Sequence, residues 1–199
     1  MTAPAHGGGG LLALLRADMT ANRANPKGRF VMLAFRLTHA LRGTGRPPLF
    51  SLPAIVLYRL VVDWMLGIEI PPSTRIGPGL CVWHGTGLVL HKRVQLGAGV
   101  TLRHGVTIGV LGDGRDEAAM APILGDRVDV GAGAIVLGPI TIGDDVSIGA
   151  GSVVLCDVPA GATAVGNPAR IIGRSDRSDR SDRTDRRDRS DRAPRTERS

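Results

Sequence analysis

The sequence predicts a parallel β-helix, with a small α-helical cap before it and a disordered tail after it. A branched apolar residue recurs at every sixth position from about residue 69 to residue 173, and glycine often follows it. The fifth residue of each unit is small or branched. This period excludes an amphipathic helix, whose faces recur every three to four residues, and is the signature of short strands stacked in a solenoid. Stacked coils then bury a core that no single unit buries alone.

The repeat falls into three phases separated by two slips. Its apolar positions are Ile70, Ile76 and Val82, then Leu90, Leu96, Leu102 and Ile108, then Leu124, Val130, Val136, Ile142, Ile148 and Val154. The first slip surrounds His84-Gly85-Thr86-Gly87, and the second spans residues 110–122. A solenoid that breaks its own period inserts a loop there, and such loops commonly carry function. We therefore expect the active site near both slips.

Composition divides the chain into four parts. We expect a Gly-rich, disordered lead over residues 1–10, a helical cap over 11–67, the β-helix over 68–173 and a disordered Ser-Asp-Arg tail over 174–199. Within the cap, helices are predicted over residues 11–24, 29–42 and 52–66, with the run Asn25-Pro26-Lys27-Gly28 as a break. The second helix is amphipathic, because Phe30, Leu33, Leu37 and Leu41 recur at helical spacing.

The third predicted helix is strongly apolar, yet it is shorter than the roughly 20 residues that span a bilayer. Two interpretations stay open: the helix packs on the first coil and on neighbouring subunits, or it lies on a membrane surface with basic residues at its edge. The start of the chain lacks the charged-then-apolar order of a signal peptide. We expect a cytoplasmic protein, with peripheral membrane contact as the alternative.

The charge and the cysteines narrow the choice of ligands. The formal net charge is +7, of which the tail after Gly173 contributes +3 through ten arginines, six aspartates and one glutamate. The modestly basic body suits an anionic ligand such as a phosphorylated cofactor, and it is no nucleic-acid footprint by itself. Cys81 and Cys156 show no metal-type spacing, so we expect free cysteines and no metal site.

His84 and His104 are the candidate proton-transfer residues. Each is the third residue of its unit, and the two units are three repeats apart once the first slip is removed. Three repeats make one turn of a three-sided coil, so both imidazoles should stack at one corner, roughly 4.8 Å apart. Such a pair favours acid–base chemistry, and the alternative is a structural corner histidine bonded to a carbonyl. No Ser-His-Asp or Cys-His arrangement is legible in the chain.

Several motifs carry a family resemblance over roughly residues 65–173. The runs EIPPSTRIGPGLCVWHGTGLVL, GAGVTLRHGVTIG and ILGDRVDVGAGAIVLGPITIGDDVSIGAGSVVLCDVPAGATAVGNPARIIG resemble the serine O-acetyltransferase branch of the hexapeptide acyltransferases. The cap sequence ANRANPKGRFVMLAFRLTHALRG and the run RHGVTIG look closer to the short, exopolysaccharide-associated members of the colanic-acid type.

The resemblance implies that the parallel β-helix is left-handed. It also implies a homotrimer, or a dimer of trimers, that transfers acetyl from acetyl-CoA to a hydroxyl in clefts between subunits. It assigns the general base to His84 and a supporting carboxylate to Glu69, and it requires no protein nucleophile. For the cofactor it implies Gly109, Gly112, Ala132, Ala150 and Arg170. Corner packing for the two alanines and capping of the last coil for Arg170 are the structural alternatives.

Two departures from the family pattern bear on the acceptor. Trp83 stands where the family has an aspartate, and Met120-Ala121-Pro122 replaces the Arg-His-Pro element that grips the carboxylate of serine. Losing charge-assisted hydrogen bonds weakens recognition of serine, although Arg115 and its acidic neighbours offer replacement charges. We therefore predict a saccharide hydroxyl as acceptor, bound by Trp83, His104 and Arg115. L-serine is the alternative, and a non-catalytic scaffold is the lesser one.

Overall fold

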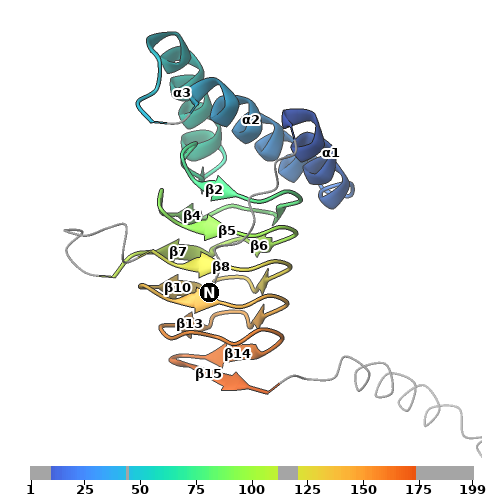
Figure 1. The fold of residues 1–199 in the computed structure, drawn as a ribbon, viewed down its shortest axis with the longest axis vertical. Coiled ribbons are helices and arrows are strands. Elements are labelled where there is room, and N and C mark those ends of the chain that lie inside the picture. The colour runs from blue at the N-terminus through green and yellow to red at the C-terminus, as the bar shows by residue number, and fades with distance from the viewer. Residues whose placement is uncertain (1–9, 44, 112–120, 174–199) are drawn as a thin grey trace, which may run out of the picture.

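The computed structural model describes residues 10–43, 45–111 and 121–173, which form a helical cap on one end of a column of short strands (Figure 1). The cap contains α1 (Leu11–Ala21), α2 (Pro26–Arg42), the 3₁₀ turn η1 (Leu49–Ser51), α3 (Leu52–Tyr58) and the π-helical turn η2 (Arg59–Met65). The third predicted helix is therefore present, but its second half is wound as a π-helix.

The strands stack into three sheets that form the sides of the column. Face A consists of β1 (Ile68–Glu69), β4 (Leu88–Leu90), β7 (Thr107–Gly109), β10 (Ile135–Leu137) and β13 (Val153–Val154). Face B consists of β2 (Arg75–Ile76), β5 (Gln95–Leu96), β8 (Ile123–Leu124) and β11 (Thr141–Ile142). Face C consists of β3 (Cys81–Trp83), β6 (Thr101–Arg103), β9 (Asp129–Val130), β12 (Ser147–Ile148), β14 (Thr163–Gly166) and β15 (Ala169–Ile172).

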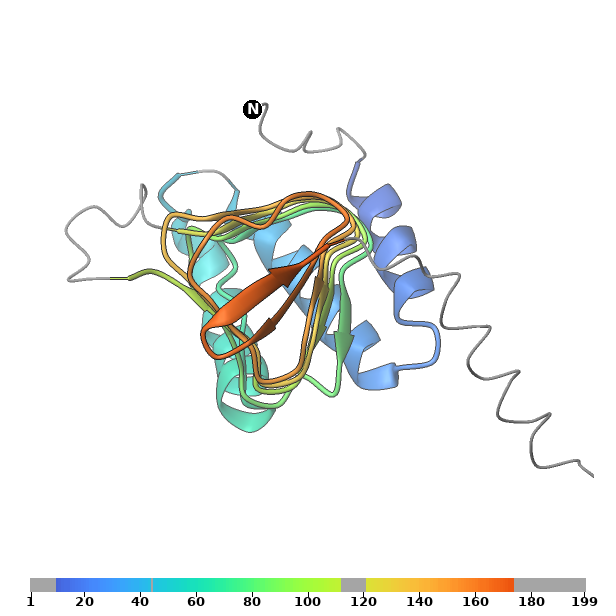
Figure 2. The same cartoon turned by 90° about the horizontal axis from the view of Figure 1, so that it is seen from below.

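Neighbouring strands on each face belong to successive coils and pair in parallel, for example Val82 with Leu102. The last pair, β14 with β15, is antiparallel and closes the column. Viewed along the axis, the chain runs clockwise as it advances toward the reader, which is the left-handed sense (Figure 2). The predicted parallel β-helix with its helical cap is confirmed.

The repeat correctly predicts the core. Every apolar first position named from the sequence is buried, and the most exposed of them, Ile76, is 9% exposed. The fifth positions turn inward as well, from Val100 and Val106 through Ser152. The six-residue period therefore reflects two inward positions in each short side of the coil, since alternate residues of a strand point to opposite faces.

The two phase slips fall at different corners. Corner 1 joins face C to face A and contains residues 84–87, 104–106, 131–134 and 149–152. Corner 2 joins face A to face B and contains residues 70–74, 91–94 and 138–140, and β7 ends before it at Gly109 while β8 begins after it at Ile123. The first slip therefore belongs to corner 1 and the second to corner 2. Face A lies between them.

The cap is fastened to the open edge of the first coil by polar side chains. The Asn22 side chain donates to the Leu80 carbonyl and accepts from the Val82 amide, and Asn25 donates to the Val82 carbonyl. These bonds pair the edge of β3 much as a neighbouring strand would. An unpaired edge is a liability for a β-sheet, so the cap completes the first coil.

Two expectations for the cap are corrected. The run from Asn25 to Gly28 is not only a break, because Asn25 accepts from the Gly28 amide and Pro26 opens α2. An asparagine N-cap followed by proline is a favoured helix start. The buried face of α2 is formed by Val31, Met32 and Phe35, whereas the predicted stripe is 41–48% exposed and lines a groove beside α3 (Phe30, Leu33, Leu37, Leu41).

Candidate active site

His84 lies at corner 1 in a backbone conformation that favours glycine. Its φ is +63°, and side chains with a Cβ visit this region at a cost of about 1 kcal/mol or more. The Gly85 amide donates to the Trp83 carbonyl over 2.7 Å, and the Thr86 amide donates to the His84 carbonyl over 2.9 Å. These bonds fold the slip into a tight turn that presents the exposed imidazole outward.

The turn brings three of the predicted site residues together. The ring centroids of His84 and His104 are 6.2 Å apart with an edge-on geometry, and those of Trp83 and His84 are 6.4 Å apart. The stacking of the two histidines at one corner follows the sequence prediction. Both imidazoles are exposed and Trp83 is half-buried, so an incoming hydroxyl can reach either histidine.

Below His104, a column of small residues continues along corner 1. The Gly105 amide donates to Thr86, the Gly133 amide to His104 and the Gly151 amide to Ala132, each over 2.9 Å. Ala132 and Ala150 therefore lie on the same corner as the histidines, one and two coils further on. A Cβ added to Gly133 or Gly151 would meet no atom of the described residues within 4 Å, so this edge is open in the described part of the chain.

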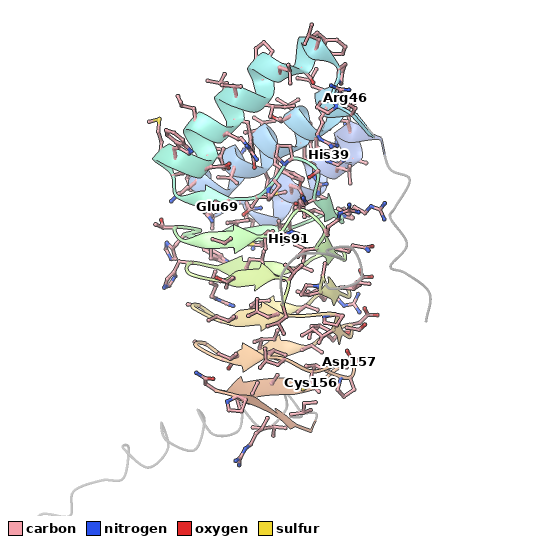
Figure 3. All side chains as sticks on the ribbon, turned by 90° about the vertical axis from the view of Figure 1, so that its left-hand side faces the viewer. His39, Arg46, Glu69, His91, Cys156 and Asp157 are labelled. Carbon is pink, nitrogen blue, oxygen red and sulfur yellow. The ribbon has the colours of Figure 1, made fainter. Side chains whose placement is uncertain are left out.

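Glu69 and Gly109 lie on face A, away from the histidine pair. Both line a hollow of about 650 Å³ between α3, η2 and the strands of face A. Arg42, Arg59 and His91 line the same hollow, and Glu69 and His91 both lie on the side shown in Figure 3. The described contacts do not join Glu69 to His84. Within a single chain, the predicted base His84 and its predicted supporting carboxylate Glu69 are therefore not in described contact.

The remaining predicted residues are placed less completely. Gly112, Arg115 and Met120 lie outside the described residues. Arg170 is exposed on β15, at the end of the column opposite to the cap. In the described ranges, groups of three His, Cys, Asp or Glu side chains that would suit a metal ion are absent; the expectation of no metal site stays a prediction.

Cys81 is poorly suited to act as a nucleophile. Burial raises the pKa of the Cys81 thiol, and the Asp129 carboxylate raises it further against the opposing effect of Arg103. A raised pKa keeps the sulfur protonated, and the thiolate is the reactive form. This agrees with a site whose chemistry depends on the histidines rather than on a covalent cysteine.

Sequence reasoning missed one residue at this corner, Lys27. Its ammonium donates to the Thr86 hydroxyl over 3.0 Å, although the two residues are 59 positions apart. The available signal was the Asn25-Pro26 helix start, which fixes the first turn of α2. The sequence did not reveal that this turn sits on corner 1.

Comparisons with known proteins agree with this fold. Residues 121–156 match the family described as "Bacterial transferase hexapeptide (six repeats)". A serine acetyltransferase of Helicobacter pylori is 46% identical over 145 residues, which cover 73% of this chain and 81% of that protein. The soybean serine acetyltransferase complexed with serine has a TM-score of 0.71 and 36% identity, covering 81% of this chain and 69% of that one.

A third relative, the Brucella abortus serine acetyltransferase in complex with coenzyme A, has a TM-score of 0.67 and 32% identity. The match covers 81% of this chain and 67% of the Brucella abortus chain. The β-helix, the hexapeptide match and these relatives together define an acyltransferase of the hexapeptide-repeat class. Within that class, the chain belongs to the serine acetyltransferase family.

The comparisons sharpen two predictions. They support the serine acetyltransferase part of the resemblance, whereas a closer likeness to exopolysaccharide enzymes stays a prediction. Across residues 10–43, 45–111 and 121–173, the helices lack the length and apolar run needed to cross a membrane. Whether the exposed Trp64 and Met65 of η2 face a membrane or a neighbouring subunit also stays a prediction.

Proposed function

We propose that this protein acetylates the hydroxyl of L-serine, with acetyl-CoA as the acyl donor. The observation that carries the proposal is the exposed His84–His104 pair, 6.2 Å apart, at the head of an open column of small residues. The Helicobacter pylori and soybean relatives are named serine acetyltransferases, which favours serine over the saccharide that the sequence placed first.

In this proposal His84 is the general base. Its imidazole accepts the proton of the acceptor hydroxyl as that oxygen attacks the thioester carbonyl of acetyl-CoA. The carbon–sulfur bond then breaks and CoA leaves as the thiol, taking its proton from the imidazolium, so direct transfer needs no protein nucleophile. The acyl donor supplies an activated thioester. Glu69 would support the imidazolium electrostatically from the start of face A, and His104 would hold the acceptor or the corner itself.

The donor is assigned to corner 1. An extended pantetheine arm needs a narrow path without bulky side chains, and Ala132, Ala150 and the neighbouring glycines leave such a path. Arg170, exposed on β15 near its end, is the proposed ligand of the nucleotide phosphates, because guanidinium groups bind phosphate well. Gly109, the last residue of β7 before corner 2, is assigned to the opposite wall.

A trimer would assemble this site. In one chain His84 is at corner 1, while Gly109 is the last residue of β7 on face A and the second slip follows it at corner 2. We propose that ring closure about a three-fold axis places corner 2 of one copy against corner 1 of the next. The acceptor and donor would then bind between two copies, as in the clefts expected from the resemblance.

A saccharide hydroxyl remains the second candidate acceptor because of Trp83. Its half-buried ring lies beside His84 with centroids 6.4 Å apart, and an aromatic face suits stacking on a sugar ring. L-serine has no ring that could stack on the Trp83 side chain. The two candidates thus differ in whether Trp83 is needed for turnover.

The deciding experiment follows thiol release from acetyl-CoA with purified protein. We expect turnover with L-serine, and little with monosaccharides or glycan oligomers at the same concentration. Trp83→Ala should leave serine turnover within a few-fold of the wild type. Turnover with a saccharide alone, abolished by Trp83→Ala, would overturn the assignment of serine.

A further inference from the structure

The first turn of α2 places a cation at the histidine corner. The Lys27 ammonium lies 3.0 Å from the Thr86 hydroxyl, and Thr86 is bonded through its amide to the His84 carbonyl. Lys27 is half-buried. Its ammonium therefore lies at the residue two positions after the proposed base, on the cap side of corner 1.

The position of Lys27 is fixed by tight packing on both sides of it. A Cβ added to Gly28 would contact the side chains of Asn22 and Asn25 and lie 3.0 Å from the Val82 carbonyl. Asn25 also bonds to that carbonyl. The backbone around Lys27 is thus held against β3, one residue before Trp83, and the ammonium is presented by a rigid element rather than by a loop.

The described hydrogen bond of the Lys27 ammonium goes to a neutral hydroxyl and not to a carboxylate. Arg36 is paired with Asp18, and Arg103 on face C with Asp129, whereas the described bond of Lys27 goes to a hydroxyl. A lysine that donates to a neutral oxygen keeps donors and full charge for an anion. Charge-assisted bonds to a carboxylate are roughly twice as strong as neutral ones.

We infer that Lys27 binds the carboxylate of the acceptor, and so selects an amino acid over other hydroxyl compounds. The inference rests on the proposed function. The order of residues along corner 1 supports it: the Lys27–Thr86 pair is on the cap side of His104, and Ala132 and Ala150 continue in the opposite direction. The acyl donor is assigned to the second side, which leaves the cap side to the acceptor. A Lys27 carboxylate site also replaces the family clamp that Met120 and Ala121 lack.

The test compares L-serine with L-serinamide, which keeps the hydroxyl and the amine but has no carboxylate. In Lys27→Ala, we expect KM for L-serine to rise about 10- to 100-fold, as for a lost hydrogen bond to a charged group. The values of kcat with L-serine, of KM with acetyl-CoA and of kcat/KM with L-serinamide should stay within about two-fold. Lys27→Arg should recover part of the preference for L-serine.

Arg29→Ala is the matched control, because it removes the same charge from the exposed side of α2. It should leave the kinetic constants with L-serine and with L-serinamide unchanged. An equal loss of kcat/KM with L-serine and with L-serinamide in Lys27→Ala, or a raised KM for acetyl-CoA, would overturn the inference. So would a serine preference that survives in Lys27→Ala while the wild type is active. A wild type that leaves both acceptors untouched would instead refute the proposed function and remove the inference with it.

Discussion

His84 combines an unfavourable backbone conformation with the position expected of a base. A residue with a Cβ at φ +63° persists only where the surroundings over-determine it, and such residues cluster at functional sites. Here the turn from Trp83 to Gly87 and the packing of Gly85 against Ile68 fix the corner. In this corner the imidazole of His84 is exposed and lies beside the ring of His104.

Replacing His84 should therefore lower the catalytic rate without weakening the binding of CoA. His84→Ala should lower kcat by about 10² to 10⁴, the usual range for a lost general base, with the affinity for CoA nearly unchanged. His104→Ala should reduce kcat less, because its proposed role is support of the corner and acceptor. Steady-state kinetics of both variants, with CoA binding measured by calorimetry, checks this; a larger loss in His104→Ala would reverse the two roles.

At this scale the sequence was informative where the repeat itself constrained the residues. The six-residue period placed His84 and His104 at one corner, because three units make one turn, and the structure has the two rings 6.2 Å apart. Lys27 was not predictable in this way. Its contact with Thr86 depends on how α2 docks on β3, which no local pattern encodes.

At the scale of elements, the cap functions as a substitute for a missing coil. Asp18, buried completely, accepts from the amides of Gly79 and Leu80, and Arg36 donates to the carbonyls of Ile76 and Gly77. The two side chains also form an ion pair over 2.7 Å. Helices α1 and α2 thereby satisfy edge groups of the first coil that would otherwise lack partners.

Breaking this pair should be costly because it leaves a buried charge unpaired. Asp18→Ala should destabilise the protein by about 3–5 kcal/mol, measured as the loss of unfolding free energy in urea. As a control, Asp145→Asn breaks an ion pair with Arg127 whose partners are 56% and 59% exposed. Exposed pairs contribute about 0–1 kcal/mol, so a similar cost for both variants would contradict the proposed role of the cap.

The π-helical turn η2 carries a carboxylate whose burial predicts a pH dependence. Burial raises the pKa of Asp63 to about 6, with Arg59 opposing the shift and Glu69 adding to it, and Asp63 Oδ1 is buried without a hydrogen bond in the described structure. The folded protein thus holds this proton more tightly than the unfolded chain. The resulting stability is full below the unfolded pKa, near 4, and is lost as pH rises through 6.

Asp63→Asn should remove this cost. The variant should be more stable than the wild type by about 1–2 kcal/mol at pH 8, and the difference should vanish near pH 4. Urea unfolding at several pH values between 4 and 8 measures it. An advantage that stays constant over this range would show that ionisation of Asp63 is not its cause.

At the scale of the whole molecule, the fold was more predictable than the site. Hydrophobic period, core and cap all follow from local pattern, since each coil repeats the same burial requirement. The expectation that both slips border one active site is different, because in a single chain they occupy corners 1 and 2. That expectation requires contacts between copies, and these lie outside what periodicity within one chain encodes.

Mixing two inactive variants tests whether the copies share sites. We expect light scattering to give three times the chain mass of 20.8 kDa, or six times for a dimer of trimers. His84→Ala removes the proposed base at corner 1, and Gly109→Glu places a bulky anion on the opposite wall, near the proposed donor site. Each variant alone should be inactive.

If corner 1 of one copy meets corner 2 of the next, equal co-expression leaves about one quarter of the sites with both parts intact. About a quarter of wild-type activity should then return. A monomer, or mixed trimers no more active than their parents, would show instead that each chain holds its own complete site.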